Sequence, residues 1–332
     1  MSVMVTGGTG FCGINMVKYL AKKGVDAICL GRSAHKEDPL RDWFIEDVKD
    51  RVHLVQGDVT DPEGLKEIIK KYDVRKIVHT AAITPDPETQ RNRSSLILSV
   101  NIAGTATLLD IARDMELDRV LYTSSAAVVA PNSELEPVDE YWALDLTSGL
   151  YPITKYASEQ LCEFYGKAYG VDAVSARLGW IYGPMERPVD ARSGMSEVYN
   201  MVHTVLEGET VRTNDLDRYR DWTHAWDLAR AMDMVLESDN LMEPMYNMTC
   251  GRSYSGHELV ATLREIMGDF DVEVVEDRAD ANVPVNSVNR RGPMSIRRLT
   301  HDTGFEPEIS LKDGLASYVE WAKKAKELFP NG

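Results

Sequence analysis

The stretch that decides the fold reads Ser2-Val3-Met4-Val5-Thr6-Gly7-Gly8-Thr9-Gly10-Phe11-Cys12-Gly13. A short apolar strand runs into glycines and then into the apolar spacing of a helix. A nucleotide-binding βαβ unit opens in this way. Gly7 permits the tight turn, Gly10 lets a pyrophosphate approach the backbone, and Gly13 lets the helix pack on the strand. Free N–H groups at the start of that helix attract phosphate. The alternative is a glycine-rich turn before an ordinary helix.

The sequence also excludes several classes of protein. Gly8 and Gly13 have the spacing of a phosphate-loop NTPase, but Ile14 and Asn15 stand where that loop requires Lys and Ser/Thr. The net charge of −16 disfavours nucleic acid and anionic membrane surfaces as partners. Because we see no apolar run near the roughly 20 residues of a membrane span, we expect no membrane segment. The seven histidines form no metal-binding motif, so we expect no metal.

The cysteines and the start of the chain bear on its compartment. Cys12, Cys29, Cys162 and Cys250 form no CxxC pair, which indicates buried thiols in a reducing compartment. The first strand begins at Ser2, so no signal peptide is visible. We therefore expect a cytoplasmic protein whose partner is a small molecule.

Strand-like and helical stretches alternate over the first half of the chain. The expected strands are 2–6, 25–30, 52–56, 76–79, 119–123 and 171–177. The expected helices are 11–23, 62–71, 96–115 and 152–169, with a further helix at 311–326. This alternation predicts an α/β fold, a doubly wound parallel Rossmann sheet covered on both faces.

The alternating pattern loosens after about Tyr182. We expect a dinucleotide-binding domain over 1–182 and a smaller C-terminal α/β substrate-binding domain over 183–332, partly interleaved with the first. The expected long loops are Pro131–Asp139, Met185–Gly194 and Ala279–Pro293.

The end of the second expected strand bears on the choice of cofactor. An acidic residue there would bind the ribose hydroxyls of NAD, but the chain reads Leu30-Gly31-Arg32-Ser33. A guanidinium matches phosphate geometry, so Arg32 and Ser33 favour the 2′-phosphate of NADP, with NAD possible. The alternative is that Arg32 is a solvated loop residue.

Two further strand ends supply candidate cofactor contacts. Asp58, followed by Val59, can accept a hydrogen bond from adenine, or it can cap the helix that opens near Pro62. Small residues at Ala81 and Ala82 let the chain pass close to a cofactor, or they form a tight strand exit.

The strongest chemical signal combines a strand end and a helix start. Ser124 and Ser125 end the fifth expected strand, and Tyr151-Pro152-Ile153-Thr154-Lys155 opens a helix. Residues four apart share a helix face, so Tyr151 and Lys155 point the same way. Removing a hydroxyl proton during hydride transfer needs a tyrosine of lowered pKa, which a nearby ammonium favours. Ser125 can hold the substrate oxygen.

With these motifs, the chain resembles the extended short-chain dehydrogenase/reductases of the NAD-dependent epimerase/dehydratase family along nearly its whole length. The resemblance implies catalysis by Ser125, Tyr151 and Lys155 and a homodimer formed by the helices at 96–115 and 152–169. It implies the following cofactor contacts: Gly7, Thr9, Gly10, Phe11, Cys12, Gly13, Asp58, Ala81, Ala82, Asn101, Ser124, Tyr151 and Lys155. Arg177-Leu178-Gly179-Trp180-Ile181-Tyr182-Gly183-Pro184, Arg220-Asp221-Trp222-Thr223-His224 and Thr303-Gly304-Phe305-Glu306-Pro307 are similar to later family motifs.

Departures from the family pattern bear on the reaction. Ala126 and Ala127 stand where family dehydratases carry acids, so sugar dehydration is disfavoured. Trp180 stands where nucleotide-sugar epimerases usually carry Asn.

We expect an NAD(P)-dependent dehydrogenase or reductase acting on a secondary alcohol or ketone of a polar, sugar-like molecule. The alternatives are a nucleotide-sugar epimerase with tightly bound NAD and a non-catalytic NADP-binding sensor. The candidate substrate contacts are Thr84, Ser125, Trp180, Tyr182 and Arg220.

Overall fold

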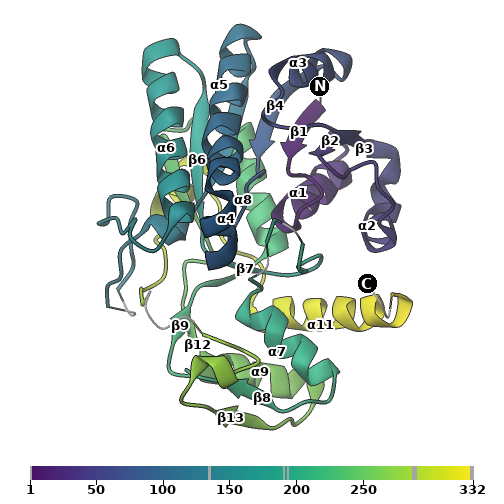
Figure 1. Cartoon of the computed structure of the whole chain (residues 1–332), viewed down its shortest axis with the longest axis vertical. Helices are drawn as coiled ribbons and strands as arrows, with labels where there is room; N and C mark the ends of the chain where they lie inside the picture. The colour runs from purple at the N-terminus through teal and green to yellow at the C-terminus, as the bar shows by residue number, and fades with distance from the viewer. Residues whose placement is uncertain (1, 134–135, 190, 193, 286–289, 330–332) are drawn as a thin grey trace.

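The computed structural model describes residues 2–133, 136–189, 191–192, 194–285 and 290–329. Its centre is a seven-stranded parallel sheet with the order β11-β6-β5-β4-β1-β2-β3 (Figure 1). The strands are β1 (Ser2–Thr6), β2 (Asp26–Gly31), β3 (Val52–Gln56), β4 (Val74–His79), β5 (Arg119–Ser125), β6 (Ala173–Leu178) and β11 (Met245–Met248). The strand order reverses between β1 and β4, and such a reversal opens a crevice at the carboxyl ends of the strands.

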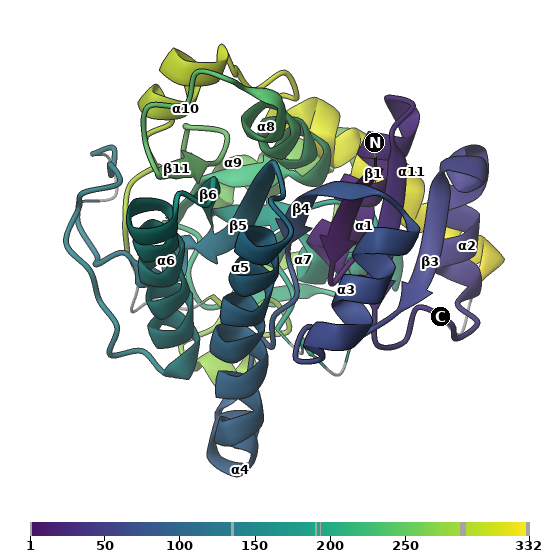
Figure 2. The same ribbon diagram turned by 90° about the horizontal axis from the view of Figure 1, so that it is seen from above.

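Helices cover both faces of this sheet (Figure 2). Alternate strand residues point to opposite faces, so Val3 and Val5 pack in one core and Met4 in the other. The helices that contribute to the first core are α1 (Phe11–Lys22), α2 (Pro39–Ile45), α8 (Ala225–Glu237) and α10 (Arg297–Thr303). Those that contribute to the second are α3 (Pro62–Lys71), α4 (Pro87–Leu98), α5 (Gly104–Asp114) and α6 (Leu150–Tyr169). Strands buried on both faces read as continuous apolar runs, as observed here.

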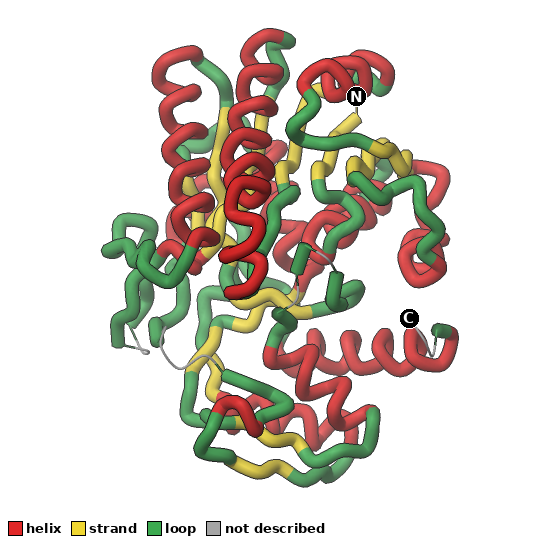
Figure 3. Tube along the Cα trace, in the orientation of Figure 1, coloured by secondary structure: helices red, strands yellow, loops and turns green. Residues whose placement is uncertain are grey.

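A smaller α/β lobe lies below the sheet in Figure 1 and contains short strand pairs (Figure 3). Its helices are α7 (Glu197–Leu206), α9 (Gly256–Met267) and α11 (Leu311–Leu328). The strand pairs are β7 (Trp180–Tyr182) with β10 (Trp222–His224), β9 (Tyr219–Arg220) with β12 (Tyr254–Ser255), and β8 (Val211–Thr213) with β13 (Val272–Val274). Val198, Leu259 and Leu315 share a third apolar core that holds the three helices together.

The fold class predicted from the sequence is confirmed, and each of the six expected strands lies within two residues of its predicted ends. Strand β11 and helix α8 come from the C-terminal half but pack with the sheet of the N-terminal half. The two halves are thus interleaved, while the division near residue 182 stays a prediction.

The helix expected at 96–115 begins earlier than the sequence indicated. Helix α4 (Pro87–Leu98) leads through a π-helical turn, η2 (Ser99–Ala103), into α5. Asp86 caps α4 by accepting a hydrogen bond of 2.7 Å from the Thr89 backbone N–H, and Pro87 occupies the first helical position. The first two turns of α4 have a polar composition, so they lack the apolar periodicity from which a helix is predicted.

The run Pro87–Asp114 is also long and apolar enough to cross a membrane, judged by length and composition alone. Half of its most apolar window is buried inside the protein, and a core helix gives the same signal.

Loops and short helical turns account for the segments predicted as long loops. The described parts of 131–139, 185–194 and 279–293 are mostly irregular, and the turn η4 (Arg278–Asp280) enters the last of them. Residues 134–135, 190, 193 and 286–289, which fall in these loops, lie outside the described residues. Two other short turns are η1 (Glu46–Arg51) and η3 (Ala126–Val128).

Candidate active site

The glycine loop between β1 and α1 has the geometry that a pyrophosphate requires. Gly7 has φ +65°, and a Cβ there would lie 2.7 Å from the Ala81 backbone. A Cβ on Gly13 would lie 2.3 Å from the Gly7 carbonyl oxygen, so the helix can approach the turn only because Gly13 has no side chain. Gly10 caps α1 without a side-chain hydrogen bond, which leaves the helix N-terminus free for phosphate.

Two adjoining cavities flank this loop and together form a groove. The larger, of about 520 Å³, contains the predicted catalytic residues, and the smaller, of about 320 Å³, lies at the ends of β2 and β3. Gly7, Thr9, Gly10, Thr80 and Ala82 line both cavities. A dinucleotide has two nucleoside halves joined by a pyrophosphate, and this arrangement offers a cavity for each half with the glycine loop between them.

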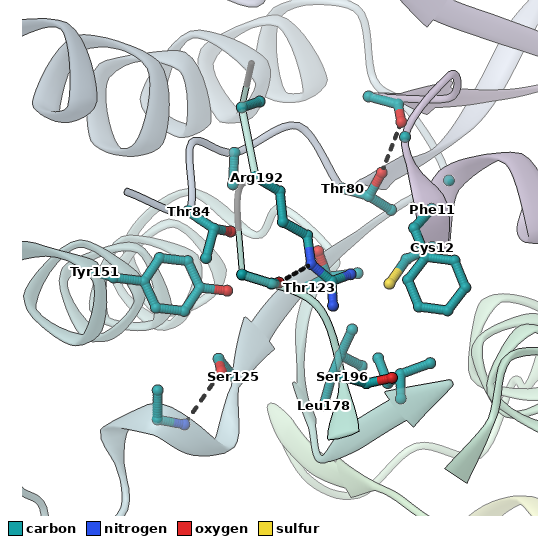
Figure 4. Close-up of a pocket in the computed structure, with 18 of the residues that line it drawn as sticks. Phe11, Cys12, Thr80, Thr84, Thr123, Ser125, Tyr151, Leu178, Arg192 and Ser196 are labelled. Atoms are coloured by element: carbon teal, nitrogen blue, oxygen red, sulfur yellow. Dashed lines mark hydrogen bonds between the residues drawn. The ribbon is translucent and has the colours of Figure 1, made fainter. Parts of the chain in front are cut away.

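The three predicted catalytic residues meet in the larger cavity. Ser125 ends β5, while Tyr151 and Lys155 lie on the first turns of α6. Figure 4 shows the hydroxyl of Tyr151 pointing into the cavity, with Ser125 and Thr84 on the same side. The start of α6 is fixed by Gln90 of α4, whose side-chain oxygen accepts a hydrogen bond of 2.8 Å from the Leu150 backbone N–H.

Burial and hydrogen bonding act in opposite directions on Tyr151. Burial raises the pKa of its phenol above the usual value, while hydrogen bonds with the side chains of Ser125 and Thr84 lower the pKa. The guanidinium of Arg192 lowers the pKa of Tyr151 further through its charge. The effect of burial is the largest, so the pKa of Tyr151 stays above its usual value and these contacts offset only part of the rise.

Lys155 is buried and donates a hydrogen bond of 2.7 Å to the Thr123 carbonyl oxygen. Burial lowers the pKa of its ammonium to about 8. Its Nζ lies 5.6 Å from the centre of the Tyr151 ring. The expectation that Lys155 lowers the pKa of Tyr151 stays a prediction, because the cation identified as doing so is Arg192.

Most of the predicted cofactor contacts line the groove. In the larger cavity these are Gly7, Thr9, Gly10, Phe11, Cys12, Gly13, Ala82, Ser124, Tyr151 and Lys155. In the smaller cavity they are Arg32, Ser33, Asp58, Val59 and Ala81. The Ser124 hydroxyl donates a hydrogen bond of 2.5 Å to the buried Glu159 carboxylate, so it is engaged on the side away from the groove.

Asn101 is buried and lines neither cavity in the described part of the chain. Its amide bonds both backbone groups of Ile83, at 2.8 and 3.0 Å, and the Thr154 hydroxyl at 3.1 Å. The amide therefore ties the chain after β4 to α6, which gives Asn101 a positioning role, and its contact with a cofactor stays a prediction.

The alternative that Asp58 caps a helix is wrong. Asp61 caps α3 and accepts a hydrogen bond of 3.1 Å from the Gly64 backbone N–H. Asp58 instead accepts hydrogen bonds from the backbone N–H and the hydroxyl of Thr60, at 2.9 and 2.8 Å, and lines the smaller cavity.

The predicted substrate contacts divide into two groups. Thr84, Ser125 and Trp180 line the larger cavity, whereas Tyr182 and Arg220 line neither cavity within the described residues. Tyr182 is 1% exposed and belongs to the core of the small lobe. Arg220 is 2% exposed, stacks 4.0 Å from the Trp180 ring centre and forms a 3.0 Å ion pair with Glu197. The structure therefore places Arg220 behind Trp180 and Tyr182 in the core of the small lobe, in contact with His224 and Tyr318.

Sequence reasoning missed three arginines of the larger cavity, Arg187, Arg192 and Arg291. Arg291 is 8% exposed and donates a hydrogen bond of 2.7 Å to the Ala126 carbonyl oxygen, directly beside Ser125. Its Nε is buried with no hydrogen-bond partner among the described residues. All three arginines lie on irregular segments, whose sequences have no periodicity from which to predict the side chains that face a cavity.

Comparison with known proteins identifies the family of the chain. Residues 3–249 match the model of the NAD dependent epimerase/dehydratase family. The chain therefore belongs to this family, which makes it an enzyme of the epimerase/dehydratase type with a nicotinamide cofactor. A UDP-glucuronate 4-epimerase of Thermodesulfobacterium geofontis is 26% identical over 98% of this chain and 97% of its own.

Solved structures of related enzymes share the fold. The UDP-glucose 4-epimerase of Thermus thermophilus, in complex with NAD, gives a TM-score of 0.80 at 25% identity, covering 98% of this chain and 100% of the other. The UDP-glucose 4-epimerase of Thermotoga maritima, with UDP-glucose, gives a TM-score of 0.81 at 23% identity. The match covers 98% of this chain and 99% of the other.

Proposed function

We propose that the protein is a nucleotide-sugar epimerase that keeps its nicotinamide cofactor bound through the reaction. The observation that carries the proposal is the cavity itself. Tyr151, Ser125 and Thr84 converge on one point beside the glycine loop, and Arg291 supplies a buried cation nearby. This combination suits a substrate that presents an alcohol to Tyr151 and an anionic group, such as a diphosphate, to Arg291. The sugar-nucleotide epimerases named above support the same proposal.

In the proposed reaction each residue of the cavity has a separate role. A bound nicotinamide supplies the acceptor and donor for a hydride at the substrate carbinol carbon. The Tyr151 phenolate removes the hydroxyl proton and later returns it, while the Ser125 hydroxyl holds the substrate oxygen. The Lys155 ammonium holds the ribose of the cofactor. Inversion would require the transient ketone to turn within the cavity, so that a hydride could be returned to its other face.

Dehydration is disfavoured by the same cavity. Ala126 and Ala127 line it after Ser125, so no acid stands there to protonate a departing hydroxyl. The leading expectation from the sequence, a dehydrogenase or reductase with exchanging cofactor, remains the second candidate. It is favoured by the absence of a carboxylate after Leu30 at the end of β2. The sensor alternative is disfavoured because Tyr151 and Lys155 both stand in the cavity.

The form of the cofactor is a separate proposal. The Thermus thermophilus structure named above holds NAD. In this chain the exposed Arg32 and Ser33 line the smaller cavity, which suits a 2′-phosphate. We expect NADP to bind at least as tightly as NAD, and Arg32→Ala to weaken NADP binding about tenfold while sparing NAD. A preference for NAD in the unaltered protein would overturn this proposal.

One experiment separates the candidate functions. Protein purified without added nucleotide is denatured, and any released cofactor is identified by mass spectrometry. The native protein is then incubated with UDP-glucose and UDP-glucuronate without added cofactor, and the products are separated by chromatography. Stoichiometric cofactor and a C4 epimer support the epimerase. An empty protein that reduces added NAD or NADP with these substrates, and forms no epimer, supports the dehydrogenase.

Assembly and location remain proposals as well. Leu98 on α4 and Ile153 and Phe164 on α6 are exposed apolar side chains, which supports a homodimer formed through these helices. Sedimentation of the protein and of Phe164→Glu tests this, since the variant should be monomeric. A cytoplasmic location is tested by cell fractionation.

A further inference from the structure

One segment crosses the groove between its two cavities. It comprises Met185–Val189 together with Ala191 and Arg192, and we call it the strap. Arg187, Val189 and Ala191 line both cavities. The Ala191 carbonyl oxygen accepts a hydrogen bond of 2.8 Å from the Thr84 backbone N–H, so the strap is attached to the chain that follows β4. The glycine loop lines the same two cavities. A dinucleotide that fills both would therefore lie between the glycine loop and the strap.

An ion pair closes the strap on the adenosine side of the groove. The two terminal nitrogens of Arg187 donate to the two carboxylate oxygens of Asp38, one of them at 3.1 Å. The side chains are only 25% and 22% exposed. Burial alone would raise the pKa of Asp38, but hydrogen bonds from Arg187 and from the Arg41 backbone N–H outweigh it and lower the pKa. A bidentate pair of this kind is among the stronger charge-assisted contacts.

Asp38 is held in place independently of the strap. It caps α2 and accepts a hydrogen bond of 3.0 Å from the Arg41 backbone N–H. The ion pair thus joins α2, which follows β2, to a segment 149 residues further along the chain.

A second ion pair joins the two ends of the strap to each other. The buried Glu186 carboxylate accepts hydrogen bonds of 2.7 Å from the backbone N–H and the hydroxyl of Ser196, and it pairs with Arg192 at 2.7 Å. Figure 4 places the Arg192 guanidinium inside the cavity, between Tyr151 and Phe11. The Cζ atom of Arg192 lies 5.3 Å from the centre of the Phe11 ring, and Phe11 is the first residue of α1. The strap therefore presents a fixed positive charge on the side where the glycine loop would receive a pyrophosphate.

We propose that the strap is a cofactor latch: the Arg187–Asp38 pair must open before the dinucleotide can leave, and the latch thereby keeps the cofactor in place between turnovers. The proposal deepens the function proposed above and rests on it for the presence of a dinucleotide in the groove. An epimerase needs such retention, because its cofactor must return the hydride that it received.

The test measures cofactor release without measuring turnover. Protein loaded with NADH, and in parallel with NADPH, is mixed with excess ADP-ribose, and the loss of nicotinamide fluorescence gives the release rate. The variants are Asp38→Asn, Arg187→Gln and their combination. Asn still offers an oxygen to cap α2, so Asp38→Asn removes the charge and keeps the helix start. Asp118→Asn is the control, since it breaks a similarly exposed pair with Arg75 at the amino end of β5.

We expect each single variant to release the nucleotide about fivefold faster, as befits one partly buried ion pair. The double variant should be no faster than either single one, because both remove the same contact. The Asp118→Asn control should release the nucleotide at the rate of the unaltered protein. The melting temperatures of all five proteins should be alike. Release rates within twofold of the unaltered protein, or effects that multiply in the double variant, would overturn the latch. If the latch variants release faster but no protein epimerises a nucleotide sugar, the proposed function fails and the latch stands.

Discussion

The buried ion pair beside Ser124 gives the sharpest stability prediction. Glu159 of α6 and Arg177 of β6 have side chains only 3% and 2% exposed. Two parallel hydrogen bonds, both of 2.8 Å, join the Arg177 guanidinium to the carboxylate. The carboxylate also accepts the 2.5 Å hydrogen bond from Ser124, and Arg177 donates at 2.9 Å to the Glu140 carbonyl oxygen.

Removing one charge leaves the other buried without a counter-ion. Glu159→Gln keeps the size of the side chain and an oxygen for Ser124 but leaves the Arg177 charge uncompensated. The expected loss is about 4 kcal/mol in the free energy of unfolding, the usual cost of breaking a buried pair. For a chain of this size the melting temperature should fall by roughly 10 °C.

The assay is a double-mutant cycle followed by circular dichroism during urea unfolding. Glu159→Gln and Arg177→Met are measured singly and together. The sum of the two single-variant losses in unfolding free energy should exceed the loss in the double variant by about 2 kcal/mol. The reason is that the double variant buries no unpaired charge. Glu163→Gln, which breaks the exposed pair with Lys167 on the same helix, should leave stability almost unchanged. Losses that add within about 0.5 kcal/mol would refute the reasoning.

Three further outcomes are expected. Tyr151→Phe should lower the turnover rate by about a thousandfold while cofactor still binds, measured by product chromatography and nicotinamide fluorescence; full activity would remove Tyr151 from catalysis. The NADH dissociation constant should rise as the pH passes about 8, because the Lys155 ammonium is protonated below that pKa and loses its charge above it. A fluorescence titration should show this rise. The Lys155→Met variant should bind NADH weakly, with a dissociation constant that does not change with pH. Gly13→Ala should abolish copurified cofactor, since its Cβ would lie 2.3 Å from the Gly7 oxygen, whereas Gly166→Ala, with its nearest contact at 3.4 Å, should not.

The sequence predicted the sheet and the centre of the site because both are encoded locally. Strands buried on both faces appear as apolar runs, and the helices between them repeat with their own period. The glycine loop is a contiguous motif, and the spacing of Tyr151 and Lys155 places them on one helix face. Such features depend on neighbours a few residues away, so they can be recognised before the fold is known.

Only the tertiary structure decided which distant residues complete the site. Tyr182 and Arg220 belong to family motifs, yet packing buries Tyr182 in the core of the small lobe and Arg220 behind Trp180. Arg192 and Arg291 enter the cavity from irregular segments, and Arg187 meets Asp38 across 149 residues of chain. No local period governs the path of a loop. Which loop side chains meet is set by the packing of the elements that the loops connect, and that packing exists only in the folded chain.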